Sequence, residues 1–167
     1  MSLLPACHLL AYGTLLGTTV YQSFVMTKVC YTALPMSSFT TLQRKVFPVY
    51  FRLQSTLLIV TALTYPPTSL LALYKAPVDA GLLAFASATA LANLAKYGPA
   101  TSTAMVERIH QETRDGKKFN DPSGPSEEMH LRNRAFSRNH AMSIHLNLLS
   151  VGATVAYGFR LASRLRF

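Results

Sequence analysis

Charged residues are scarce in this chain of 167 amino acids: they make up 14% of it, while half of the residues are apolar. An ordinary soluble domain carries roughly 25% charged residues, so the shortage disfavours that class. The apolar content also excludes intrinsic disorder. The sixteen Lys and Arg residues outnumber the seven Asp and Glu residues, and they lie between and after the apolar stretches. This placement of charge is typical of a membrane protein.

The sequence also lacks the motifs of common catalytic and metal sites. It has no Gly-rich phosphate loop, Ser-His-Asp set, paired carboxylates, H-E-x-x-H or C-x-x-C. Its basic residues are not interleaved with aromatic residues, as a base-stacking surface requires. Cys7 and Cys30 are about 23 helical residues, or roughly 34 Å, apart and cannot form a disulfide within one chain. We therefore expect no enzymatic activity, no cofactor, no metal site and no nucleic-acid partner.

Four apolar stretches predict an all-α polytopic membrane protein, a four-transmembrane-helix bundle made by a single domain, residues 1–167. The expected spans are about 3–27, 47–65, 79–97 and 141–161. The first stretch has no positively charged residues before it and is longer than the apolar part of a secretory signal. We therefore expect it to be retained as a helix.

Proline, glycine and aspartate residues mark the expected ends of the spans. Pro48 is expected in the first turn of the second span, and Pro66-Pro67 should end that span. Asp79 is expected to cap the third span, and Gly98-Pro99 should close it.

The one strongly polar region, residues 100–140, predicts a helical hairpin that extends the third and fourth helices. Residues 100–114 should continue the third helix, since Met105, Ile109 and Glu112 recur with helical spacing. Residues 115–125 hold many turn-forming residues. Ser126 should then start a helix that runs into the fourth span.

The distribution of cations predicts the orientation in the membrane. With four spans, the region from Lys28 to Arg52 and the region from Lys96 to Arg138 share one side and hold twelve of the sixteen Lys and Arg residues. The positive-inside rule places both regions in the cytosol and both termini on the other side. Three cations, Arg160, Arg164 and Arg166, weigh against this orientation. Among organelles, the endomembrane system (ER) is favoured over mitochondria.

Small residues on two helices predict close packing. Gly13 and Gly17 form a G-x-x-x-G pattern, and alanines repeat every fourth residue from Ala80 to Ala92. Both patterns let helices approach closely, and packing within this bundle is favoured over homodimerisation.

Polar residues inside the spans predict a shared interior layer. Along the fourth helix, one face carries Asn133, Ser137, His140, Ser143, Asn147, Ser150, Thr154 and Gly158. Such a face should avoid lipid. Gln22, Gln54, Asn93 and Asn147 fall at similar depths, one on each helix. Hydrogen bonds that fix helix register are favoured over ligand binding as the role of this layer.

The five histidines, His8, His110, His130, His140 and His145, favour structural roles over metal binding. His140 and His145 lie about 140° apart around a helix and cannot chelate one ion from one face. His140 is expected to point toward the third helix and to hydrogen-bond a backbone carbonyl, Thr101 or Tyr50. Glu107 and Arg108 are expected either to pair with Arg132, Asn133 or Arg134 or to form a solvated face.

Three segments resemble the transmembrane protein 205-like family, a eukaryotic four-helix membrane domain of unassigned biochemistry. Residues 42–51, LQRKVFPVYF, are similar to its Q-x-x-L-F-P-x-Y-F signature, and residues 99–108 to its P-x-T-x-x-M-x-E-R segment. Residues 133–148 are similar to its N-R-x-F and H-x-x-S-x-x-x-N-L pattern, with Ala141 where the family has Gly. The resemblance implies functional residues at Gln43, Pro48, Tyr50, Glu107, Arg108, Asn133, Arg134, His140 and Asn147, to which the interior layer adds Asn93.

Two functional hypotheses follow. In the first, a non-enzymatic integral membrane protein binds a protein partner in a membrane complex, a lipid head group or a small solute through its cytosolic polar cluster. Arg44, Lys45, Lys117 and Lys118 would supply the attraction for an anionic surface. The alternative is a haem- or metal-binding membrane module that uses inward-facing histidines, by analogy with other four-span domains.

Overall fold

The computed structural model describes residues 3–165, and all of the regular secondary structure in that range is helical. The first rod joins α1 (Leu4–Val20), the π-helical segment η1 (Tyr21–Met26) and α2 (Thr27–Ala33). The second rod is α3 (Met36–Leu63), and the short α4 (Leu70–Tyr74) follows it. The third joins α5 (Pro77–Ala92), the π-helical η2 (Asn93–Tyr97) and α6 (Gly98–Asp115). The fourth is α7 (Glu127–Ala162).

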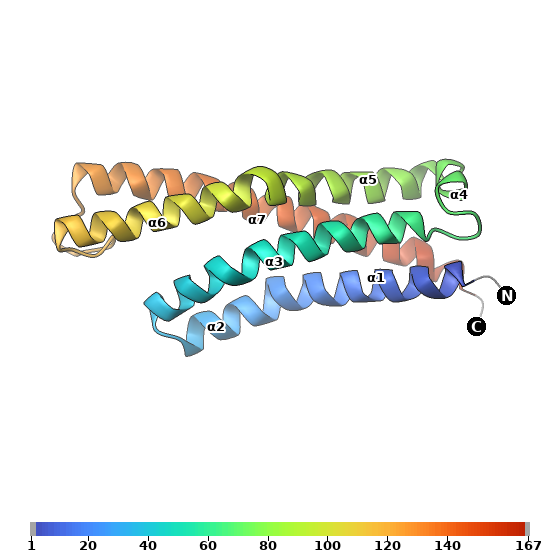
Figure 1. Cartoon of the computed structure of the whole chain (residues 1–167), viewed down its shortest axis with the longest axis horizontal. Coiled ribbons are helices and arrows are strands. Elements are labelled where there is room, and N and C mark those ends of the chain that lie inside the picture. The colour runs from blue at the N-terminus through green and yellow to red at the C-terminus, as the bar shows by residue number, and fades with distance from the viewer. Residues whose placement is uncertain (1–2, 166–167) are drawn as a thin grey trace.

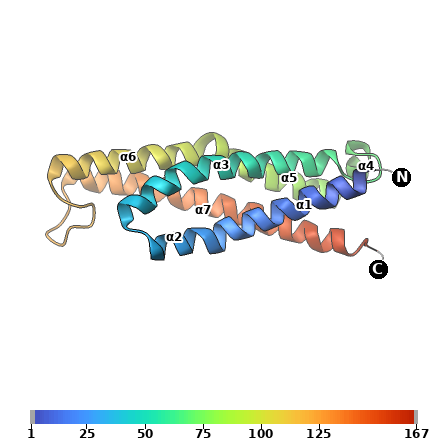
Figure 2. The same cartoon turned by 60° about the horizontal axis from the view of Figure 1, so that its bottom comes forward.

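The four rods lie side by side in one elongated bundle (Figure 1). The start of α1, the end of α7 and the short α4 lie at one end, which we call the α4 end. The loop between α6 and α7 lies at the opposite end. The hairpin of α2 and α3 and the hairpin of α6 and α7 diverge toward that end (Figure 2). We call this the hairpin end. Residue Arg166 of the predicted basic tail lies outside the described residues.

The second helix is longer than the sequence predicts. It begins at Met36 rather than near residue 47, so Pro48 lies inside α3 and not in its first turn. Only Leu34 and Pro35 separate α2 from α3. The polar residues that suggested a loop are compatible with a helix outside the apolar region, since the hydroxyls of Thr40 and Thr41 donate to carbonyls one turn earlier.

The third rod continues through Gly98-Pro99, as expected. The π-helical η2 directly precedes this pair and changes the hydrogen-bond spacing where Pro99 has no N–H to donate. Gly98 is required by close packing, because a Cβ there would lie 3.1 Å from the ring of Phe51 and 2.7 Å from the carbonyl oxygen of Asn93.

Other predicted helix ends are partly confirmed. The second helix ends at Leu63, just before Pro66-Pro67. The hydroxyl of Ser126 accepts a hydrogen bond from the Met129 amide, and α7 runs without a break from the hairpin into the last apolar stretch. Asp79 is not the N-cap of α5. That position belongs to Ala76, and Asp79 lies in the first turn with its side chain fully buried.

The interior core is built from large side chains rather than from the small-residue faces. Leu15, Leu58, Leu83 and Tyr157 are among its fully buried members. Gly13 and Gly17 are exposed, and nothing lies within 4 Å of a Cβ built on either. Ala84 and Ala88 are exposed as well, whereas Ala80 packs against the core, so the predicted packing fails at Gly13, Gly17, Ala84 and Ala88. Between α3, α4 and α5, Ala80 and Ala84 instead line an apolar groove of about 320 Å³.

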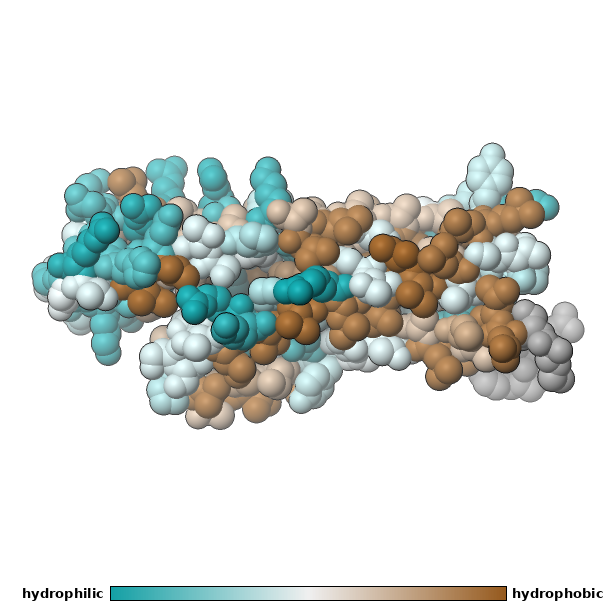
Figure 3. Space-filling view, in the orientation of Figure 1, coloured by the Kyte–Doolittle hydropathy of each residue, from teal (hydrophilic) through white to brown (hydrophobic). Residues whose placement is uncertain are grey.

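The surface of the bundle is markedly apolar away from the hairpin end. Exposed large apolar side chains occur on every long rod, for example Phe24 on η1, Ile59 on α3, Phe85 on α5 and Phe159 on α7. Figure 3 shows hydrophobic residues over the α4 end and the middle, and hydrophilic residues gathered at the hairpin end. Among the described residues, two helices are long and apolar enough to cross a membrane, Met36–Leu63 and Pro77–Asp115.

Candidate functional site

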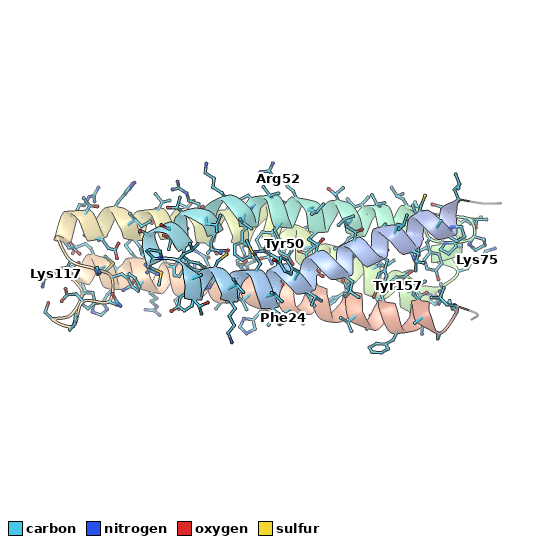
Figure 4. The ribbon with its side chains drawn as sticks, turned by 90° about the horizontal axis from the view of Figure 1, so that it is seen from below. Phe24, Tyr50, Arg52, Lys75, Lys117 and Tyr157 are labelled. Carbon is cyan, nitrogen blue, oxygen red and sulfur yellow. The ribbon has the colours of Figure 1, made fainter. Side chains whose placement is uncertain are left out.

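The predicted site residues fall into two groups along the bundle. Tyr50, Asn93 and Asn147 turn toward the interior, where Tyr50 is visible between the helices in Figure 4. Glu107, Arg108, Asn133, Arg134 and His140 lie on the α6–α7 hairpin. Gln43 is buried on α3, and its side-chain oxygen has no partner within residues 3–165. No single pocket brings all nine together.

Asn147 is the centre of the interior group. Its Oδ1 accepts a 2.7 Å hydrogen bond from the hydroxyl of Tyr50, and its Nδ2 donates to the hydroxyl of Ser23 over 2.8 Å. Gln54 donates through Nε2 to the hydroxyl of Ser150 over 3.1 Å, and that hydroxyl donates to the carbonyl of Ala86. Hydrogen bonds thus join helices η1, α3, α5 and α7 across the interior.

The interior layer predicted from depth is largely present. Gln22, Gln54 and Asn93 are buried and Asn147 is half-buried, so none of the four points away from the bundle. Asn93 donates through Nδ2 to the carbonyl of Ser143 over 3.0 Å. Gln22 differs, since it lies near Thr27 of its own rod, with a 3.5 Å separation between Nε2 and Oγ1. Both π-helical segments coincide with this layer, because Gln22 lies in η1 and Asn93 begins η2.

Some buried acceptors in the layer have no hydrogen-bond partner in the described part of the chain. They are the side-chain oxygens of Gln54, Ser55 and Asn93. Every one of these residues also lies on the interior side of its helix. The bonds to Ser150 and Ser143 fit the register-fixing role, whereas the oxygens of Gln54, Ser55 and Asn93 are left unsatisfied by the described chain.

The hairpin residues form a stack of planar groups around Arg108. The guanidinium carbon of Arg108 lies 4.0 Å from the ring centre of Phe119 and 4.4 Å from that of Phe136. The ring of His140 stacks on that of Phe136, with centres 5.2 Å apart and an interplanar angle of 17°. We call Phe119, Arg108, Phe136 and His140 the Arg108 stack.

The remaining hairpin residues behave differently from one another. Glu107 pairs with Arg132 over 2.8 Å, one of the alternatives left open by the sequence, and both side chains are exposed. Arg134 is exposed. The side chain of His140 makes no hydrogen bond within residues 3–165; Tyr50 bonds Asn147 instead, and Thr101 bonds the carbonyl of Tyr97. The expected hydrogen bond of His140 is therefore wrong, and ring stacking takes its place.

A second polar cluster, at the α4 end, was not predicted. Asp79 forms ion pairs with Arg160 and Arg164, and the hydroxyl of Tyr65 donates to its Oδ2 over 2.6 Å. Asp79 is the single acidic residue outside the 107–128 region, and the two arginines are four residues apart. That combination could have suggested the pairing. Because Arg160 and Arg164 are paired with a buried carboxylate, they weigh less against the cytosolic orientation of the hairpin.

His8 is the one buried histidine, so the set of inward-facing histidines that the haem or metal alternative requires is not found among the described residues. Its Nδ1 donates to the carbonyl of Thr61 over 2.9 Å, and its Nε2 lies 2.6 Å from the hydroxyl of Tyr157. The other four histidines are exposed. Within residues 3–165, no three His, Cys, Asp or Glu side chains are arranged to hold a metal ion. Cys7 and Cys30 are both free, as their predicted separation requires.

Comparison with known proteins gives one family and one relative. The family model described as Domain of unknown function (DUF4149) matches residues 10–110, more than half of the chain. The chain is 44% identical over 164 residues to "Xanthocillin biosynthesis cluster protein D" of Aspergillus fumigatus, which covers 98% of this chain and 92% of the relative. No solved structure matches the chain.

Proposed function

This chain belongs to the DUF4149 family, whose description assigns no activity, and from that premise we propose a function based on its surfaces. The chain is proposed to be an integral membrane protein with four spanning helices. A belt of cations at the cytosolic membrane boundary binds anionic lipid head groups. We also propose that the chain is related to the transmembrane protein 205-like family, which its sequence resembles.

The distribution of polar and apolar side chains carries the membrane assignment. In the middle of the bundle, the amides of Gln54 and Asn93 are buried, while Phe24, Ile59 and Leu148 are exposed. In water this arrangement leaves apolar surface unburied on all four rods, whereas hydrocarbon favours it. The continuous rod from Leu4 to Ala33 and the last part of α7 share this surface with the two apolar helices. We therefore assign four spans rather than two.

The belt is defined by depth. Hydrogen bonds join Ser23, Tyr50 and Asn147, which therefore mark one level in the bundle. Five exposed cations lie five to nine residues nearer the hairpin end, so at about 1.5 Å per residue they fall within about 6 Å of one another. These residues are Lys28, Arg44, Lys45, Lys96 and Arg138, and we call them the basic belt.

The basic belt contains no acidic residue. Six of the seven acidic side chains lie beyond it, between Glu107 and Glu128, and the seventh is Asp79 at the α4 end. None of the five belt residues forms an ion pair with another residue of the described chain. Cations near an anionic membrane surface each contribute about 1 kcal/mol of binding. The belt is therefore better placed to bind anionic lipid than Lys117 and Lys118, which lie among the acids.

The name of the relative links that protein to a biosynthesis cluster and states no reaction. Accordingly, the proposed role for this chain is that of a membrane component of a biosynthetic cluster, without a reaction of its own. Protein partners in such a complex would meet the hairpin beyond the basic belt.

Lipid retention tests the belt. The chain is placed in nanodiscs of mixed phosphatidylcholine and phosphatidylserine, and the lipids that stay bound are counted by native mass spectrometry. Replacing Arg44, Lys45 and Lys96 by Gln should reduce phosphatidylserine affinity on the order of 100-fold, from about 1 kcal/mol for each residue. The control replaces Arg114, Lys117 and Lys118 by Gln and removes the same charge from the hairpin tip. If both variants retain the same amount of phosphatidylserine, the proposal that the basic belt binds anionic lipid is contradicted.

A further inference from the structure

The Arg108 stack has a charged centre that forms no direct ion pair in the described chain. None of the ion pairs within residues 3–165 involves Arg108, and its buried Nε has no hydrogen-bond partner. The nearest acid in sequence on the same face is Glu112, whose charge acts on Arg108, but its Oε1 accepts a hydrogen bond from the amide of Phe119. A guanidinium held partly out of water without an acceptor is unfavourable unless a ligand supplies one.

The stack restricts the direction from which a ligand can approach. The guanidinium of Arg108 lies over the rings of both Phe119 and Phe136. The N–H groups of a guanidinium point outward in its plane, so an acceptor must approach edge-on. Two oxygens of one phosphate or carboxylate match that edge with two parallel hydrogen bonds. The ring of His140 stacks on Phe136 and therefore lies beside this cluster, where its signal can report binding.

The loop residue Phe119 is fixed in position over Arg108. Its amide donates to Glu112 of α6 over 2.8 Å, and its carbonyl accepts from Nδ2 of Asn133 on α7 over 3.1 Å. The Oδ1 of Asn133 is buried and has no partner in the described chain. An anion that carries a hydroxyl proton would satisfy this oxygen, which a fully ionised carboxylate does not.

We infer that the Arg108 stack binds a phosphate monoester group, with Arg108 donating to its oxygens and Asn133 accepting its proton. The phosphate comes either from a lipid head group such as phosphatidic acid or from a soluble phosphate. Arg108 packs against Phe136, two residues from the belt residue Arg138. The lipid source therefore rests on the proposed membrane function, while binding of soluble phosphate does not.

The histidine side chains report binding in the unmodified protein. The full chain in detergent is titrated with inorganic phosphate, and the ring signals of its histidines are followed by NMR. The His140 signal should move to saturation, while that of the exposed His130 on the same helix should not. A matched titration with sodium chloride should leave both unchanged. A His140 signal that responds equally to both salts overturns the inference.

Variants locate the response. Arg108→Gln should weaken phosphate binding at least tenfold, while Arg114→Gln, an exposed arginine on the same helix, should stay within twofold of wild type. Arg108→Lys keeps the charge but loses the planar donor pair, and it should also weaken binding, which guards against a folding defect. Equal affinities for Arg108→Gln and Arg114→Gln overturn the site.

Nanodiscs distinguish the two sources and separate this inference from the proposed function. A His140 shift in nanodiscs that contain phosphatidic acid, but not in phosphatidylcholine alone, identifies the lipid as the source. A shift with inorganic phosphate alone identifies a soluble ligand. Loss of phosphatidylserine retention in the belt variant with an unchanged His140 response supports both proposals. If the chain retains phosphatidylserine but its His140 signal does not respond to any phosphate, only the inference that the Arg108 stack binds phosphate is overturned.

Discussion

Gly158 lies on α7 directly against the buried ring of Tyr12. A Cβ at this position would overlap the Tyr12 hydroxyl and lie 2.9 Å from the ring carbon that carries it. We expect Gly158→Ala to lower the free energy of unfolding in detergent by about 1–3 kcal/mol, because the Tyr12 ring must move. Gly152→Ala, with nothing within 4 Å, is the control and should be neutral or stabilising. Equal melting temperatures for the two variants would show that Tyr12 has room to move.

His140 provides a pH-dependent prediction outside the spans. Partial burial against its neighbours, followed by the positive charge of Arg108, lowers the pKa of His140 below its usual 6.5. The neutral ring is therefore favoured in the folded hairpin, and its contribution to stability is lost as the pH falls through the folded-state pKa. An NMR titration in phosphate-free buffer should show His140 titrating below 6.5, and Arg108→Gln should raise its pKa. A pKa unchanged by that substitution would mean that Arg108 does not face His140.

The sequence predicts which residues turn inward better than it predicts their partners. Gln54 and Asn93 could be assigned to the interior because amides are disfavoured in lipid. The role of Ser23 could not be predicted, since a serine hydroxyl in an apolar helix can equally bond its own backbone. The partner of His140 was mispredicted, although Phe136 lies one turn before it on the same helix, a spacing that brings two side chains together.

At the scale of elements, Asp79 joins the start of α5 to the end of α7. Its carboxylate is fully buried and pairs with Arg160 and Arg164, whose side chains are about two-fifths exposed. Asp79→Asn should destabilise the protein by about 1–3 kcal/mol in thermal unfolding, a value reduced by the exposure of the arginines. Glu107→Gln breaks the exposed pair with Arg132 and should change stability by at most about 1 kcal/mol. A larger effect for Glu107→Gln would contradict this ranking.

Helix identity was more predictable from the sequence than helix length. Proline pairs and turn residues correctly indicated the end of α3 and the hairpin loop at 116–126. Residues 36–46 were left outside the second span because they precede its apolar stretch, although polar residues also suit a helix that extends beyond an apolar span. The π-helical segments η1 and η2 have no sequence signal that distinguishes them from ordinary helix.

At the scale of the whole molecule, a polar interior and an apolar exterior form one consistent pattern. Burial of Gln54, Asn93 and Ser150 beside exposed Ile59, Phe85 and Leu148 is the reverse of the usual soluble arrangement. The first and last rods share this pattern with α3 and α5. The central claim is therefore that all four rods cross the membrane, with the hairpin in the cytosol.

Cysteine labelling in sealed vesicles with the cytosolic face outward tests this claim most directly. In a background with Cys7 and Cys30 replaced by Ser, single cysteines are placed at exposed Tyr74, Asn120 and Ser163. An impermeant maleimide should label Asn120→Cys at once and should label Tyr74→Cys and Ser163→Cys only after the vesicles are opened. If α3 and α5 alone crossed the membrane, Ser163→Cys would be labelled together with Asn120→Cys in intact vesicles, and that result would contradict the four-span account.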